Sequence, residues 1–161
     1  MIIRVFLFLA LSFSYFVSAE QISIMSYNLN NLFDAQDDVG KDDKAYLPIE
    51  FKNNDDHIMG CLQVNNSKWR NECLFLDWSE ELVQKKISNI SDLLISMGES
   101  QPDIIAIQEI ENLNVLRMLF SKIEALGYTD FALSEGDVYR GIDNGIISSI
   151  RFMAHEILRL D

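Results

Sequence analysis

The sequence contains few of the residues that define fibrous, low-complexity or zinc-binding proteins: 7 Gly, 2 Pro, 2 Cys and 2 His among 161 residues. So little Gly and Pro excludes a collagen-like or low-complexity chain, and a hydrophobic fraction of 48% excludes an intrinsically disordered one. Basic residues are also few, with 13 Lys and Arg against 25 Asp and Glu, which gives a formal net charge of −12. A protein this acidic has no broad basic surface for nucleic acid. It needs cations, a local basic patch or a small substrate.

The first 19 residues differ from the rest of the chain. Arg4 is their only charged residue, and an apolar run at 5–17 is followed by small residues that end at Ala19. This pattern predicts a secretory signal peptide at 1–19, which leaves residues 20–161 as a secreted or periplasmic protein. The alternative is a membrane anchor, but the run is shorter than the roughly 20 apolar residues that a span needs. We therefore expect no stable membrane anchor.

Both cysteines, Cys61 and Cys73, lie in the part of the chain that we expect to be exported. An oxidising compartment permits a disulfide between them, and a bridge would stabilise a short polar segment. The alternative is two free thiols, because sequence spacing does not establish the Cα separation. Two Cys without paired His spacing give no zinc signature.

The apolar pattern predicts one domain of the α/β class. We expect a strand at 22–27, little regular structure at 35–77, and a helix from Asp77 or Ser79 to Gly98. A buried strand at 103–109, a helix from Asn112 to Gly127, strands at 128–133 and 142–150, and a further strand at 152–160 complete the list. Early alternation of strand and helix followed by strands indicates a layered α/β sandwich with a mixed sheet.

Two polar residues stand at the predicted strand ends. Asn28 ends the first strand, and Glu109 ends the second. Ligands of open α/β sheets bind beyond the carboxyl ends of the strands, and carboxylate and amide oxygens suit a hard cation such as Mg²⁺. The alternative is that Glu109 is a solvated strand end and Asn28 a turn-forming residue.

Three segments resemble one known superfamily when they are taken together and in order. They are ISIMSYNLNNLFD, PDIIAIQEIEN and YRGIDNGIIS. They resemble the endonuclease/exonuclease/phosphatase superfamily, and most closely its exported bacterial branch. The intervening KWRNECLFLDWSEELVQKKISNI is also similar to that branch, so the resemblance extends over residues 22–152. It implies about half of a four-layer α/β sandwich and a metal-dependent phosphodiester hydrolase, with nucleic acid among its substrates.

The resemblance also implies roles for individual residues. Glu109 matches the metal-binding glutamate of the superfamily, and Asn28 matches the asparagine near the metal and the phosphate. The implied cofactor is Mg²⁺, with Mn²⁺ or Ca²⁺ as alternatives.

Four further residues match two short motifs of the superfamily, of which the motif of Arg140 and Asp143 lies at the rim of the active site. Arg140 and Asp143 match an Arg-Gly-Ile-Asp motif that contacts substrate phosphate, and the alternative for them is an ion pair that shapes the turn. Asn31 and Asp34 match an Asn-Leu-Phe-Asp motif. We expect them to structure the loop first, with proximity to the metal second.

The chain also departs from the superfamily pattern. It lacks the Gly-Asp-Phe-Asn and Ser-Asp-His motifs of the superfamily's second half. Of its two histidines, His57 is expected to face solvent in the polar loop, and His155 is not preceded by Asp. The chain therefore resembles the N-terminal portion of such a domain, and a missing C-terminal half becomes an expected partner.

Two functions follow as hypotheses. The first is an exported, Mg²⁺-dependent nuclease whose parent protein carries both halves of the site, with little activity from this chain alone. The second is a non-catalytic or vestigial binding module of the same fold, which the missing Asp and His groups favour. The exact substrate and the oligomeric state do not follow from the sequence.

Overall fold

A computed structural model describes residues 21–153. The predicted signal peptide at 1–19, His155 and most of the predicted strand at 152–160 lie outside the described residues. Within residues 21–153, no helix is both long enough and apolar enough to cross a membrane.

The described residues form a four-stranded mixed sheet with helices, which confirms the predicted α/β class. The strands lie in the order β1-β2-β4-β3; β1 and β2 are parallel, and β4 is antiparallel to both of its neighbours. The strands are β1 Ile24–Leu32, β2 Ile104–Ile110, β3 Asp130–Ser134 and β4 Asp143–Ser148. The helices are α1 Asp55–Leu62, α2 Ser67–Phe75, α3 Glu80–Ser96 and α4 Leu113–Ile123. Short 3₁₀ turns occupy Lys44–Tyr46 (η1), Ile49–Phe51 (η2), Gly98–Ser100 (η3) and Glu124–Leu126 (η4).

Helices α3 and α4 begin and end close to their sequence signals. The Ser79 hydroxyl accepts a hydrogen bond from the Leu82 N–H at 3.3 Å and caps α3, while the Asn112 side chain accepts one from the Val115 N–H at 3.0 Å and caps α4. Gly127, with a left-handed φ of 100°, ends the turn that follows α4. Each helix buries one stripe of apolar residues: Val83, Ile87, Ile90 and Leu94 of α3, and Val115, Leu116, Leu119 and Ile123 of α4.

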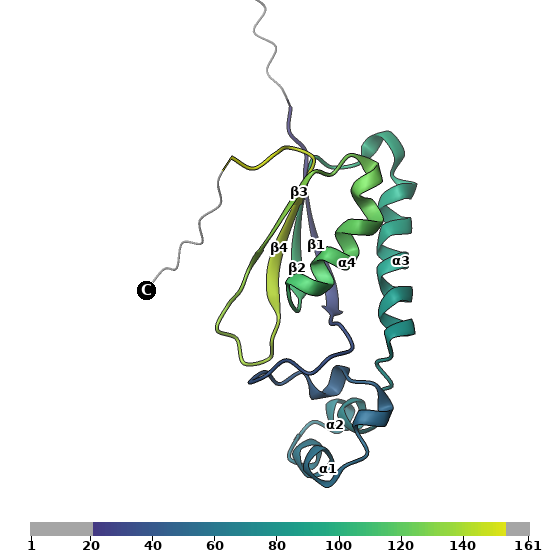
Figure 1. Cartoon of the computed structure of the whole chain (residues 1–161), viewed down its shortest axis with the longest axis vertical. Coiled ribbons are helices and arrows are strands. Elements are labelled where there is room, and N and C mark those ends of the chain that lie inside the picture. Colours follow the sequence, from purple (N-terminus) through teal and green to yellow (C-terminus); the bar gives the residue numbers. More distant parts are fainter. Residues whose placement is uncertain (1–20, 154–161) are drawn as a thin grey trace, which may run out of the picture.

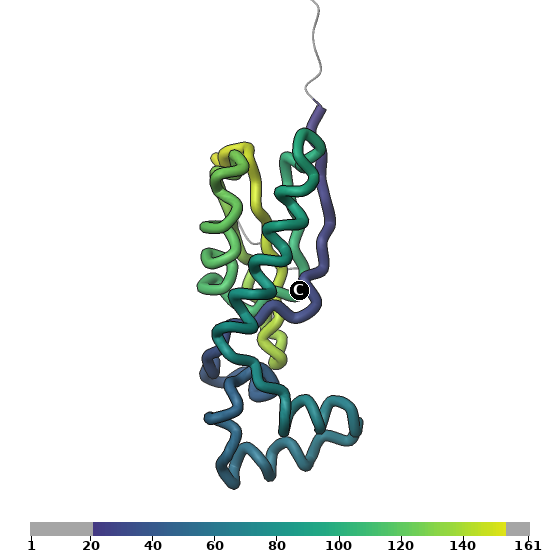
Figure 2. The backbone as a smooth tube through the Cα atoms, turned by 90° about the vertical axis from the view of Figure 1, so that its right-hand side faces the viewer, coloured from purple at the N-terminus to yellow at the C-terminus, as the bar shows by residue number. Residues whose placement is uncertain are grey.

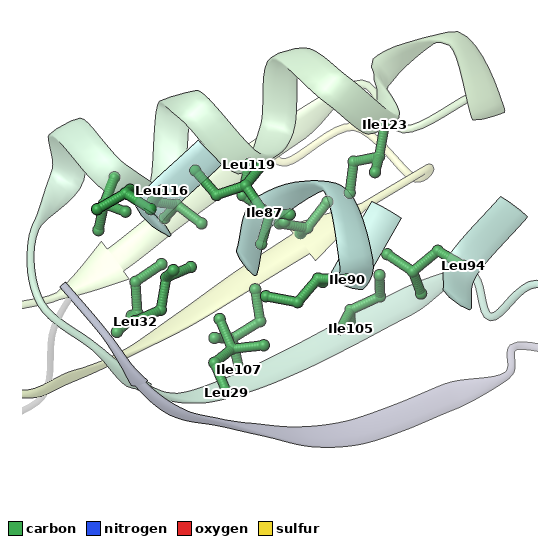
Figure 3. Packing of buried hydrophobic residues seen from close by; sticks show 14 of the residues in the cluster. Leu29, Leu32, Ile87, Ile90, Leu94, Ile105, Ile107, Leu116, Leu119 and Ile123 are labelled. Carbon is green, nitrogen blue, oxygen red and sulfur yellow. The ribbon is translucent and has the colours of Figure 1, made fainter. Parts of the chain in front are cut away.

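The hydrophobic core lies between these two helices and one face of the sheet. Ile105, Ile107 and Ile147 project from the central strands into it and are almost fully buried. Figure 3 shows the side chains of α3 and α4 packed over those of the strands. Burying one such side chain contributes about 1.5–3 kcal/mol, so this face is the main source of stability.

The opposite face of the sheet is not covered by any described element. Figures 1 and 2 show α3 and α4 side by side on one face only. Side chains alternate along a strand, so Ile24, Ala106 and Ile146 project from the face opposite to the core. Ile24 is 68% exposed.

The segment at 35–77 was predicted to lack regular structure, and this prediction is wrong. It contains α1, α2 and two 3₁₀ turns, which form a small helical projection below the sheet in Figure 1. Asn54 caps α1 and Asn66 caps α2 through their side-chain oxygens. Both helices are short, and in a sequence rich in Asp, Asn and Lys their caps resemble turn residues.

A disulfide joins α1 to α2. Cys61 and Cys73 are bridged with a Cα–Cα distance of 5.6 Å, so of the two alternatives left by the sequence the structure contains the bridge. His57 lies against it and is buried, which corrects the expectation that this side chain faces solvent. Its Nε2 is 2.9 Å from the Cys73 carbonyl oxygen and 3.2 Å from the Cys61 sulfur. His57 therefore belongs to the packing of the two helices.

Candidate functional site

Strands β1 and β2 each contain an irregularity at the same level of the sheet. Asn28 pairs with Gln108 in register, and the next pair is Leu32 with Ile110. The first strand was predicted to end at Asn28, but it continues through this irregularity to Leu32. Glu109 is the unpaired extra residue of β2, since its neighbours pair with consecutive residues of β4. Bulges of this kind change the direction of a side chain and occur near active sites.

The hydrophobic core explains where the irregularities fall. Leu29 and Leu32 are both buried in the core, and so are Ile107 and Ile110. In a regular strand, residues three apart would face opposite sides of the sheet. Each strand keeps both apolar residues in the core only by bending the backbone between them. The polar residues between them, Asn30 and Asn31 in β1 and Glu109 in β2, therefore lie outside the regular strand pairing.

The backbone at this level is strained. Asn30, Asn31 and Glu109 have left-handed φ angles of 52°, 62° and 59°. Asn tolerates this region better than most residues, whereas Glu adopts it at a cost of about 1 kcal/mol or more. Strain of this kind persists only where the surrounding contacts enforce it, and it is concentrated at functional sites.

The structure brings the side chains of Asn28 and Glu109 to the same pair of backbone groups. Asn28 Oδ1 accepts a hydrogen bond from the Asn30 N–H at 2.7 Å, and Glu109 Oε2 accepts one from the next N–H, that of Asn31, at 3.1 Å. The second carboxylate oxygen of Glu109 has no hydrogen-bond partner among residues 21–153. The metal ligands that these two side chains offer are all oxygen atoms. Mg²⁺ is a hard cation that prefers oxygen ligands and retains several waters, so these residues fit Mg²⁺.

Lys86 of α3 faces the same bulge. Its ammonium donates to the carbonyl oxygens of Asn30 at 2.6 Å and Asn31 at 2.8 Å, and it lies 5.1 Å from the centre of the Trp78 ring. Burial lowers the pKa of Lys86 to about 8, against the opposing attraction of the Glu109 carboxylate. A partly buried positive charge therefore lies next to the carboxylate of the candidate metal site.

A pocket opens between the end of β1 and the helical projection. Its volume is about 630 Å³. The lining includes Lys44, Lys68, Lys86 and Arg140, and its two acidic residues are each paired with one of these lysines. Trp69, 61% exposed, contributes an aromatic face to the lining. The acidic chain thus concentrates basic and aromatic side chains in one place, which is suitable for an anionic ligand with a ring.

The side chains of the two charged residues in the Arg-Gly-Ile-Asp motif lie in different environments. Arg140 lines the pocket and donates to Asn31 Oδ1 at 2.6 Å, which links the motif to the bulge of β1. Asp143 is buried, accepts a hydrogen bond from the Gly136 N–H at 2.7 Å and does not line the pocket. No ion pair joins Arg140 to Asp143 in the part of the chain that the structure describes.

Asp34 structures the loop that follows β1. It is buried; its Oδ1 accepts a hydrogen bond from the Gln36 N–H, and its Oδ2 accepts from the side-chain amides of Asn112 and Asn114. This is the loop-structuring role that the sequence indicated. Through these contacts, Asp34 connects the end of β1 to the start of α4.

Sequence reasoning missed the basic lining and the bulges. Lys44, Lys68 and Lys86 are distant in sequence, and only the fold of 35–77 brings them together. The bulges did have a sequence signal. The segments LNNL at 29–32 and IQEI at 107–110 share one pattern, in which two polar residues stand between two apolar ones. A strand with both apolar residues on one face has to bulge between them.

No family model, curated protein or solved structure matches the chain.

Proposed function

We propose that this chain supplies the metal-binding and phosphate-binding part of a Mg²⁺-dependent phosphodiester hydrolase whose substrate is nucleic acid. The observation that carries the proposal is the convergence of Asn28 and Glu109 on adjacent N–H groups of a strained bulge. The basic pocket beside this bulge supports it, because a phosphodiester bound there would lie next to the metal ligands.

Each group has a specific task in this proposal. Glu109 and Asn28 hold Mg²⁺, with Mn²⁺ or Ca²⁺ as alternatives, and the ion supplies charge stabilisation for the phosphoryl oxygens. Lys86 and Arg140 bind and orient the phosphate, and Trp69 offers a surface on which a base can stack. The superfamily resemblance supports the same assignment of Glu109 and Asn28.

The fold class that we propose is about half of a four-layer α/β sandwich. The uncovered face of the sheet supports this, since a second layer packed there would bury Ile24 and Ile146. Such a layer, as a C-terminal half or as a separate chain, is the partner that we propose. It would supply the groups that activate water, which hydrolysis requires in addition to the metal.

We also propose that the protein is exported to a secreted or periplasmic location. The Cys61–Cys73 disulfide supports export, because structural disulfides persist mainly in oxidising compartments.

A second candidate function is a binding module without turnover. One observation favours it. The two acidic residues in the pocket lining, Asp42 and Glu72, form ion pairs with Lys44 and Lys68. Among residues 21–153, no histidine lines this pocket. Neither acidic residue of the lining is therefore free to act as a general base on water.

Binding of a fluorescently labelled single-stranded oligonucleotide tests the proposal. Anisotropy should show binding in Mg²⁺ that is lost in EDTA, and Lys86→Met should weaken it about tenfold, as loss of a charge-assisted phosphate contact predicts. Lys85→Met is the matched control, since Lys85 is exposed, adjacent in sequence and outside the pocket lining.

Two results would contradict the proposal: binding that is equal in Mg²⁺ and EDTA, or a Lys85→Met defect as large as that of Lys86→Met. Gel analysis of the same samples shows whether the chain cleaves the oligonucleotide by itself. Cleavage would exclude the binding module, whereas binding without cleavage is expected of both candidate functions, because the proposed hydrolase takes its water-activating groups from the second layer.

A further inference from the structure

A second group of carboxylates lies outside the pocket, at the junction of β1, β2 and α4. One carboxylate oxygen each from Asp38, Asp43 and Glu111 lies within 4.8 Å of the others, and we call these three residues the acidic cluster. Asp38 and Asp43 come from the loop after β1, and Glu111 directly follows β2. The cluster therefore joins segments that are about 70 residues apart in sequence.

Hydrogen bonds fix one oxygen of each carboxylate in the cluster. Glu111 Oε2 accepts from the Asp34 N–H at 2.7 Å, and Asp43 Oδ2 accepts from the Asp38 N–H at 2.7 Å. Asp38 Oδ2 accepts from the Asn112 side-chain amide at 3.2 Å. Each carboxylate is thus oriented by a hydrogen bond from a backbone or side-chain amide, as the ligands of metal sites usually are.

The remaining oxygens of Asp43 and Glu111 are buried and unsatisfied. Asp43 is 1% exposed and Glu111 is 3% exposed, and neither Asp43 Oδ1 nor Glu111 Oε1 has a hydrogen-bond partner among residues 21–153. A buried carboxylate oxygen without a partner costs several kcal/mol, so natural proteins rarely retain one without a ligand. These two oxygens are an observation independent of the clustering itself.

No basic side chain neutralises the acidic cluster. The ion pairs among residues 21–153 are Lys44 with Asp42 and Lys68 with Glu72. Burial, with the negative charges around it, raises the pKa of Glu111 to about 9. Burial also raises the pKa of Asp43 to about 6. The environment of these carboxylates lacks the positive charge that would stabilise their ionised form.

We propose that the acidic cluster binds a Ca²⁺ ion through Asp38, Asp43 and Glu111. Two oxygens of one coordination shell lie at most twice the metal–oxygen distance apart, which is about 4.6–5.2 Å for Ca²⁺. The three carboxylate oxygens of the cluster lie within 4.8 Å of one another, so a single Ca²⁺ ion can contact all three. Three carboxylates on loops also suit Ca²⁺, which accepts irregular oxygen geometry, better than Mg²⁺.

The ion would act on the geometry of the neighbouring site. Glu111 lies two residues after Glu109, and Asp38 and Asp43 follow the bulge that contains Asn30 and Asn31. A cation bound by both segments ties the end of β2 to the loop after β1. It would therefore hold the two strand ends in a fixed position, a role separate from binding substrate.

Calcium titration and thermal unfolding of the oxidised chain test the proposal. Calorimetry should find a Ca²⁺ site with a Kd of about 10⁻⁵–10⁻³ M that is lost in Glu111→Gln and kept in Glu109→Gln, and this site should bind Mg²⁺ more weakly. Ca²⁺ at 100 times its Kd should raise the Tm by roughly 5–10 °C. In Glu111→Gln this rise should disappear, while the Tm in EDTA should equal or exceed that of the unmodified chain because a buried acid is removed.

Asp92→Asn and Glu109→Gln are the controls, and both should keep the calcium-dependent rise. Asp92 is an exposed acid on α3, and Glu109 belongs to the other proposed metal site, so the two proposals fail separately. The proposal is overturned if the unmodified chain shows no saturable Ca²⁺ site, if Mg²⁺ binds the site more tightly, or if Glu111→Gln retains the rise in Tm. Asp43→Asn provides the same test should Glu111→Gln fail to fold.

Discussion

At the scale of single residues, the structure places several charged side chains where water does not reach them. Lys52 is the clearest case. It is 3% exposed, and its ammonium donates to the carbonyl oxygens of Ala45 and Leu76, both at 2.7 Å. Burial lowers the pKa of Lys52 to about 8, and the attraction of Asp77 opposes this shift. The charged form is therefore less favourable in the folded protein than in the unfolded chain.

This shift predicts a dependence of stability on pH. Between pH 8 and about 10.5 the unfolded chain binds more protons at Lys52 than the folded protein, so the free energy of unfolding should rise with pH. The free energy of unfolding of the unmodified chain, minus that of Lys52→Met, should rise by about 3 kcal/mol over this range. Denaturant titrations at several pH values measure it. A difference that stays constant or shrinks as the pH rises would contradict the prediction.

The site residues differ in how far the sequence reveals them. Asn28 and Glu109 were identified from their positions near the predicted strand ends and from the superfamily resemblance, and the structure brings both to one bulge. The contribution of Lys86 was not predictable, because it depends on how α3 packs against β1. A side chain that acts through tertiary contact leaves no local signal in the sequence.

At the scale of elements, the helices with local signals were predicted and those stabilised by distant contacts were not. Helices α3 and α4 have clear caps and one apolar stripe each. Helices α1 and α2 are short and mostly polar, and they depend on the disulfide and on the buried side chains of His57 and Lys52. Their stability is tertiary, which is why a periodicity argument misses them.

The disulfide should therefore stabilise α1 and α2 specifically. It joins cysteines 12 residues apart, and closing a loop of this size stabilises a protein by about 3 kcal/mol. The double variant Cys61→Ser/Cys73→Ser should lose about this much stability. Hydrogen exchange should show faster exchange in α1 and α2 while α3 and β2 keep their protection. Uniform loss of protection across all four elements would contradict this assignment.

At the scale of the whole molecule, the described residues form a sheet with helices on one face (Figure 1), and the metal site that we propose lies near the carboxyl ends of β1 and β2. The α/β class and the mixed sheet followed from the sequence. The pairing of β1 with β2, the basic pocket and the acidic cluster became visible only once the strands were arranged in space. All three depend on segments that meet through long-range contacts.

The account depends on the claim that Asn28 and Glu109 hold one divalent ion. Mn²⁺ binding followed by electron paramagnetic resonance tests it most directly, measured throughout in chains that also carry Glu111→Gln, so that the acidic cluster does not compete for the ion. We predict one Mn²⁺ site that Mg²⁺ displaces, with affinity reduced about tenfold or more in Glu109→Gln and in Asn28→Ala but unchanged in Asp92→Asn. Equal Mn²⁺ affinity with and without Glu109→Gln would contradict the claim.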